Sequence, residues 1–190
     1  ITGIGQGYMQ TTPIQLCLMT AQLANGGHKI YPKIIVNEND ETLEEIKILM
    51  QKQFEKNKES NNSLAEATEE IFSIKNKRYA TLYENFENIK IVREAMFAST
   101  NEIRGTSYSS RIKDPKYQFA GKTGTSQVKR ITEEQRALEL KTLEIPYNER
   151  DHALFIAFGP YKNPRYALSI VVEHGGSGSA TAAPMAKKLF

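Results

Sequence analysis

The chain has 190 residues, of which 39% are hydrophobic and 25% are charged, and its net charge is +3. These values suit one globular domain with a sizeable core, and they disfavour a nucleic-acid partner because the basic residues do not form a block. No apolar run approaches the roughly 20 residues that a membrane span needs. Cys17 is the only cysteine, so an intramolecular disulfide is excluded, and its place in a predicted helix favours a buried, unreactive thiol.

The first predicted helix begins after a glycine-rich loop. Thr12 is a suitable N-cap, Pro13 fits the first helical position, and Gln15 completes a capping box. The expected apolar stripe consists of Ile14, Cys17, Leu18, Ala21 and Ala24. Asn-Gly-Gly at 25–27 ends the helix, after which we expect an exposed His28 and an extended segment over 29–36.

The middle of the chain changes character. Residues 37–78 are dominated by Lys, Glu, Asn and Gln, which predicts a solvated surface insertion. A second helix is predicted over 79–99. Its helically spaced apolar residues, interpreted as plain core, are Leu82, Phe86, Ile89, Val92 and Met96.

The last part of the chain predicts a sheet followed by a helix. Strands are expected over 119–128, 153–158 and 166–172, with a hairpin turn at 159–164 between the last two. Residues 130–150 read as a charged loop with a short helix, and residues 175–179 lead into a closing helix over 180–190. The predicted fold class is α+β, with an antiparallel three-stranded sheet and helices packed on it.

The most informative motif is Lys-Thr-Gly within Ala-Gly-Lys-Thr-Gly-Thr-Ser at 120–126. On an edge strand, Lys122 would supply positive charge, and the hydroxyls of Thr123 and Thr125 could hold a carboxylate. Gly124 would let a peptide-like ligand lie against the backbone. The Thr125 N–H could face a developing oxyanion, where one such donor contributes roughly 3 kcal/mol. We therefore predict Lys122 and Thr125 as catalytic, and Thr123, Gly124 and Ser126 as substrate-binding.

Other interpretations of the motif are weaker. A phosphate-binding loop would need a glycine at position 116, where Lys116 stands, and a strand-to-helix turn rather than a strand. Two further alternatives stay open: a serine β-lactamase or carboxypeptidase relative, and a non-catalytic module that senses β-lactams or binds a partner.

Five other segments accompany the motif in order. They are 5–16 (Gly-Gln-Gly-Tyr to Leu), 23–27 followed by Pro32, Gly-Thr-Ser at 105–107, Asp-His-Ala-Leu-Phe at 151–155, and Val-Glu-His-Gly-Gly-Ser-Gly at 172–178. Together these segments and the motif resemble the transpeptidase domains of class B penicillin-binding proteins, in particular those of the cell-elongation class. The resemblance covers nearly all of residues 1–190 except 37–78.

The resemblance implies part of a serine β-lactamase/transpeptidase-like fold that cross-links peptidoglycan stem peptides. A serine would attack D-Ala-D-Ala, D-alanine would leave, and an amine would accept the acyl group, while β-lactams would acylate the same serine. No cofactor or metal is implied. The implied location is the periplasmic face of the bacterial inner membrane, with the anchor on an N-terminal part outside this sequence.

The sequence departs from the family in its other two motifs. Ser-Arg-Ile-Lys at 110–113 has the letters of Ser-x-x-Lys, but the proline of 114–115 blocks the required helix. Ser-Asn-Asn at 60–62 and Ser-Thr-Asn at 99–101 have the letters of the Ser-x-Asn motif, which in the family precedes the loop at residue 5. We expect all three to be decoys, with the nucleophilic serine before Ile1.

This departure has consequences for the chain alone. Without a nucleophile it could orient a ligand but could not be acylated. With the serine-bearing helical half missing, exposed apolar surface could produce a homodimer. Asp151 and His152 suggest acid–base chemistry, but no serine pattern accompanies them, and we expect a structural role.

Overall fold

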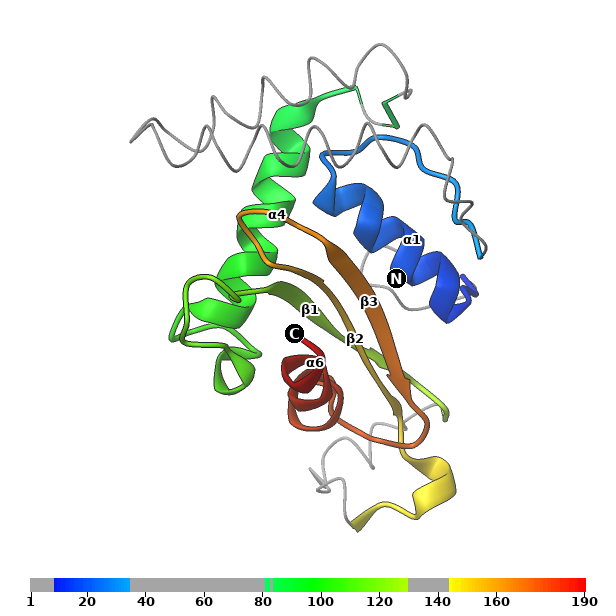
Figure 1. Cartoon of the computed structure of the whole chain (residues 1–190). Helices are drawn as coiled ribbons and strands as arrows, with labels where there is room; N and C mark the ends of the chain where they lie inside the picture. Colours follow the sequence, from blue (N-terminus) through cyan, green and yellow to red (C-terminus); the bar gives the residue numbers. More distant parts are fainter. Residues whose placement is uncertain (1–8, 35–80, 83, 130–143) are drawn as a thin grey trace.

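The computed structural model describes residues 9–34, 81–82, 84–129 and 144–190. Within these ranges a three-stranded antiparallel sheet has helices on both faces (Figure 1). The strands are β1 (Ala120–Ser126), β2 (His152–Gly159) and β3 (Tyr166–Val172), in the order β1-β2-β3. The predicted α+β class and three-stranded antiparallel sheet are therefore confirmed. The predicted polar insertion and the decoy at 60–62 lie outside the described residues.

The β2–β3 connection is a hairpin, as the sequence predicted. Gly159 pairs with Tyr166, and the amide of Arg165 donates to the Gly159 carbonyl at 3.0 Å. The Gly159–Pro160 peptide bond is cis. The amide of Tyr161 donates to the carbonyl of Gln118 at 2.7 Å, so the turn is also tied to the segment entering β1.

Helix α1 spans Pro13–Ala24 and has the predicted N-terminus. The Thr12 hydroxyl accepts from the Gln15 amide at 3.3 Å, and the Gln15 side chain accepts from the Thr12 amide at 2.8 Å. The predicted stripe is right in part: Ala24 is buried and Cys17 lies against β3, but Ile14 is 62% exposed, and the helix also buries Thr20 and Leu23. Thr20 tolerates burial because its hydroxyl donates to the Leu16 carbonyl at 2.7 Å.

Two sequence expectations near α1 have different outcomes. Cys17 is partly buried, its thiol donates to the Ala167 carbonyl at 3.4 Å, and burial raises its pKa, which agrees with an unreactive thiol. The prediction of an exposed His28 is wrong, since it is only 3% exposed. The Asn25 side chain accepts a hydrogen bond from the His28 amide and donates one to the His28 carbonyl. His28 also forms an isolated β-bridge with Thr81.

Helix α4 spans Phe86–Asn101, so it begins later than the sequence predicted. Asn85 caps it by accepting from the Glu87 amide at 2.9 Å. Leu82 lies before the helix, where its amide donates to the Gly27 carbonyl at 2.8 Å. The spacing of apolar residues placed the start of the helix too early, because this spacing does not show where the helix is capped. The Asn85 cap marks its start.

The closing segment comprises a π-helical turn, Gly178–Ala182, followed by helix α6, Ala183–Leu189. The predicted closing helix over 180–190 is thus present but begins with a wider turn. None of the described helices is both long and apolar enough to cross a membrane.

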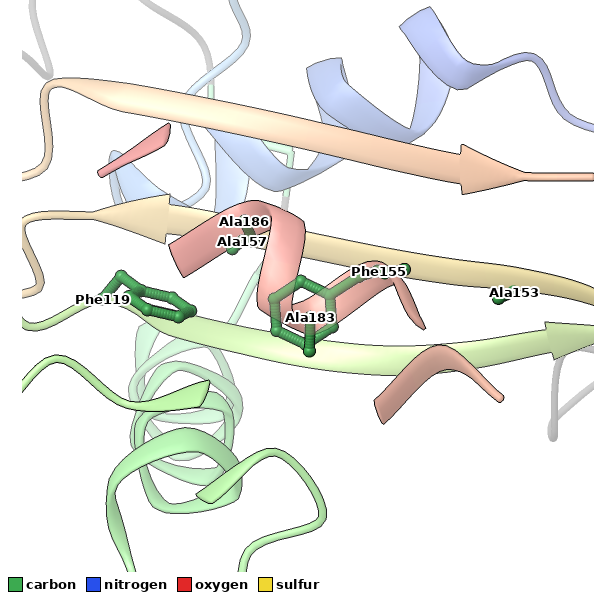
Figure 2. Close-up of a cluster of buried hydrophobic side chains, with 7 residues drawn as sticks. Phe119, Ala153, Phe155, Ala157, Ala183 and Ala186 are labelled. Carbon is green, nitrogen blue, oxygen red and sulfur yellow. The ribbon is translucent and has the colours of Figure 1, made fainter. Parts of the chain in front are cut away.

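The sheet separates two apolar clusters. On the α6 face, Phe155 and Phe119 form a fully buried cluster with the alanines of the closing segment at 182, 183 and 186 (Figure 2). On the opposite face, α1 and α4 contribute Leu23 and Met96, which pack with the β2 residue Phe158. Arg93 of α4 lies over the Phe158 ring at 5.6 Å, and burial lowers the pKa of its guanidinium.

Candidate active site

Strand β1 carries the Lys-Thr-Gly motif along one edge of the sheet. Among the described residues its only strand neighbour is β2, so its other edge is unpaired. Lys122 pairs with Ile156, which faces the α1–α4 side, whereas Thr123 pairs with Phe155, which faces α6. The motif therefore presents side chains to both faces beside an open backbone edge.

The Lys122 side chain is exposed, and its ammonium lies beside the next residue of the strand, Thr123. Its ammonium donates to the Thr123 carbonyl at 2.9 Å and lies 3.5 Å from the Thr123 hydroxyl. Within the described part of the chain these are its recorded hydrogen-bond partners. An exposed cation next to a threonine hydroxyl is an arrangement suited to binding an anionic group.

A groove of about 540 Å³ lies beside Lys122, between α1, α4 and the sheet. The groove is lined by Lys122 and by apolar residues that include Leu23, Val92, Met96 and Ile156. The interpretation of Val92 as core is wrong, because it is 41% exposed and lines this groove. Ile89 and Met96, from the same stripe, are buried as expected.

Gly105 and Thr106 of the Gly-Thr-Ser segment at 105–107 also line the groove. A β-carbon on Gly105 would lie 2.3 Å from the Ser99 carbonyl oxygen and 2.5 Å from that of Ala98, so only glycine fits there. The Ser107 amide donates to the Ser99 carbonyl at 2.9 Å, and the Thr106 and Ser99 hydroxyls are 3.2 Å apart. The turn is thus fixed against the end of α4, next to Lys122.

The two decoys in the described part of the chain cannot act as the missing motifs. Ser110 is buried at the end of a short 3-10 helix, and the backbone is already extended at Arg111, so Ser110 and Lys113 do not share a helical face. Ser99, Thr100 and Asn101 all lie within α4.

Asn101 nevertheless has a role that the sequence did not reveal. Its side-chain amide donates to the Phe97 carbonyl at 3.0 Å and to the Phe119 carbonyl at 2.9 Å. Phe119 directly precedes β1, so Asn101 ties the end of α4 to the start of the motif strand. The only sequence signal was an asparagine at a helix end, which is too common to identify such a contact.

Asp151 and His152 have structural partners, as predicted. The Asp151 carboxylate accepts from the Val128 amide at 3.2 Å, just beyond the end of β1. Nδ1 of His152 accepts from the His174 amide at 2.9 Å, and the two rings are 4.9 Å apart. These contacts join the ends of β1, β2 and β3. No group of three or more His, Cys, Asp or Glu side chains in the described ranges is arranged to hold a metal.

The whole chain, residues 1–190, matches the family model described as the penicillin binding protein transpeptidase domain. The chain belongs to this family. Among curated proteins it is similar to peptidoglycan D,D-transpeptidase MrdA of Salmonella typhimurium strain SL1344, at 33% identity, over 99% of this chain and 26% of that relative. MrdA of Haemophilus influenzae is 28% identical over 99% of the chain and 24% of its own length.

Solved structures agree with these relatives. The fold is similar to penicillin-binding protein 2 of Helicobacter pylori, solved in complex with MreC, with a TM-score of 0.65, 25% identity, and coverage of 99% of this chain and 25% of that one. Penicillin-binding protein 2 of Pseudomonas aeruginosa, in complex with WCK 5153, gives a TM-score of 0.59 and 29% identity, over 99% and 30%. The predicted family and its elongation-class resemblance are confirmed. The chain spans about a quarter of the length of these relatives.

Proposed function

We propose that this chain is the C-terminal part of a peptidoglycan D,D-transpeptidase that cross-links stem peptides through an acyl-serine. The observation that carries the proposal is the Lys-Thr-Gly motif on the unpaired edge of β1, with Lys122 bordering an apolar groove. An open edge with a glycine in it suits an extended peptide, because such a ligand can lie along the strand.

Each motif residue has a proposed task. Lys122 supplies positive charge at the reacting centre, and the hydroxyls of Thr123, Thr125 and Ser126 bind the substrate carboxylate. Gly124 lets the peptide approach the backbone. The Thr125 amide stabilises the oxyanion that forms when the serine attacks, and one such donor contributes about 3 kcal/mol to the transition state.

The reaction proposed is acyl transfer from D-Ala-D-Ala. The serine oxygen attacks the carbonyl, the peptide bond to the last D-alanine breaks, and D-alanine leaves with a proton. An amine of a neighbouring stem peptide then takes the acyl group and releases the serine. β-Lactams enter as substrate mimics. This chemistry implies that the whole protein acts on the periplasmic face of the inner membrane, where peptidoglycan lies.

The nucleophilic serine is proposed to lie outside these 190 residues, so the chain alone should be inactive. The test is the intact mass after incubation with a penicillin. We expect no adduct on the chain and a stable one-to-one adduct on a longer form that includes the preceding segment. An adduct on the chain would refute the severed site, with Ser110 the first suspect. Rapid loss of the adduct from the longer form would favour the β-lactamase alternative.

Lys122 provides a sharper test in the longer form. We expect Lys122→Ala to slow acylation by about 100-fold, as removal of a preorganised charged or donor group typically does. Lys188→Ala is the matched control, because it removes an exposed lysine in the last turn of α6. Equal acylation rates for the two variants would contradict the assigned role.

Self-association of the chain alone is a separate proposal. Ile14, Ile91 and Val92 are large apolar side chains exposed on α1 and α4. Such surface promotes association when it is contiguous. We expect light scattering to give the mass of a dimer, and a monomer mass at micromolar concentration would count against it.

A further inference from the structure

A buried glycine of the closing segment packs against the backbone of the motif strand. Gly178, the first residue of the π-helical turn, is buried against β1 and β2 at the level of Gly124. A β-carbon on Gly178 would lie 2.6 Å from the Leu154 carbonyl oxygen, 2.7 Å from the Gly124 carbonyl oxygen and 3.3 Å from the Gly124 nitrogen. The first two distances are shorter than real contacts allow, so only a hydrogen fits between the two backbones.

The need for glycine here is steric rather than conformational. The glycines with positive φ in the described part of the chain are Gly26, Gly27 and Gly176, and Gly178 is not among them. An alanine could therefore adopt this backbone conformation, but its methyl group would press on backbone atoms that have no rotamer to change. The pressure would fall on the middle of the Lys-Thr-Gly motif.

The loop that carries Gly178 is fastened to the start of β2. The His174 amide donates to His152 Nδ1 at 2.9 Å, and the Gly176 amide donates to the Asp151 carbonyl at 2.8 Å. The Thr181 hydroxyl donates to the Gly175 carbonyl at 2.8 Å, which joins the loop to the π-helical turn. Gly178 thus cannot retreat easily from β1.

We propose that Gly178 is a positioning residue for acyl transfer. Its contact with the Gly124 backbone sets how far β1 stands from the α6 face, and so where the Thr125 amide and the Lys122 ammonium meet the substrate. The inference rests on the proposed transpeptidase function.

The test is Gly178→Ala in the longer form that carries the serine. A displacement of several tenths of an ångström at a catalytic strand is expected to lower the acylation rate constant for a fluorescent penicillin by ten- to 100-fold. The fraction labelled at saturation should stay unchanged, since the folded protein still holds its serine. Hydrogen exchange should rise in the peptide covering 120–126.

Gly159→Ala is the matched control. A β-carbon there would meet the Phe190 ring at 2.9 Å and the Phe119 β-carbon at 3.1 Å, at the far end of β2, so it strains packing before the start of β1 without touching Gly124. We expect it to lower the melting temperature but to leave the acylation rate unchanged. If Gly178→Ala proves insoluble, His152→Phe replaces it, because it keeps a ring but removes the acceptor that fastens the loop. Several-fold slower acylation is then expected.

The outcomes separate the two proposals. An unsubstituted longer form that takes no label overturns both the transpeptidase function and the positioning role. Normal labelling of that form, together with an unchanged rate for soluble Gly178→Ala, or for His152→Phe where that variant is used, overturns the positioning role alone. A rate loss equal in Gly178→Ala and Gly159→Ala overturns it as well, because the effect would then be general destabilisation.

Discussion

Substitution of Asn101 tests whether the end of α4 fixes the start of β1. Both partners of its side-chain nitrogen are carbonyl oxygens, so this atom must donate. Asn101→Ala removes both hydrogen bonds, each worth about 1 kcal/mol net, so we expect a loss of roughly 2 kcal/mol in the free energy of unfolding. With typical domain stabilities of about 5–15 kcal/mol, this loss is large enough to measure.

Asn101→Asp is the more diagnostic variant because it keeps the shape and changes the charge. The new carboxylate would face two carbonyl oxygens in a half-buried site, which disfavours its charged form and raises its folded pKa above the unfolded value of about 3.9. The folded state then binds the proton more tightly than the unfolded state. Stability is therefore highest at low pH and falls as pH rises from about 4 through the folded pKa. The total fall is about 1.4 kcal/mol for each pH unit that separates the folded pKa from the unfolded pKa.

The assay is urea unfolding of the unsubstituted chain and both variants at pH 4.5 and 7.5, followed by circular dichroism. Relative to the unsubstituted chain, Asn101→Ala should show the same loss at both values, because alanine does not titrate. Asn101→Asp should show a larger loss at pH 7.5 than at pH 4.5. A pH-independent loss for Asn101→Asp, or no loss for either variant, would refute the proposed link between α4 and β1.

Three further experiments test other parts of the fold. Phe155→Ala should cost about 4 kcal/mol of unfolding free energy, because the ring is fully buried, whereas Phe155→Leu should cost about 1 kcal/mol; equal losses would contradict the packing in Figure 2. Thr12→Ala should lose about 1 kcal/mol through the α1 cap and Thr12→Ser almost none, as thermal unfolding would reveal. Cys17 should react with a disulfide reagent more slowly in the native chain at pH 8 than in urea, because burial raises its pKa and thiolate is the reactive form; equal rates would refute its burial.

The sequence predicted the features that local signals determine. The Thr12 capping box, the three strands and the hairpin turn follow from residue type and spacing over a few positions, and all are present. The strand that carries Lys-Thr-Gly was predicted from its residues, whereas its place at the edge of the sheet was only assumed.

The features that the sequence did not predict depend on particular hydrogen-bond and packing partners, which apolar periodicity does not identify. Thr20 is buried because a carbonyl one turn earlier satisfies its hydroxyl, and His28 is buried because Asn25 and Thr81 hold it. Val92 has the spacing of an apolar stripe, but its side chain lines the groove and is not packed in a core. The contact between Gly178 and β1 joins residues far apart in the chain, and periodicity carries no trace of it.

The pairing of Gly27 and His28 with Leu82 and Thr81 also bears on how such a chain can vary in length. These contacts hold the residues that follow α1 against those that precede α4. The entropic cost of bringing two points of a chain together grows by only about 0.6 kcal/mol for each doubling of the number of residues between them. Relatives could therefore differ in length between these two points while β1 and its groove stay the same.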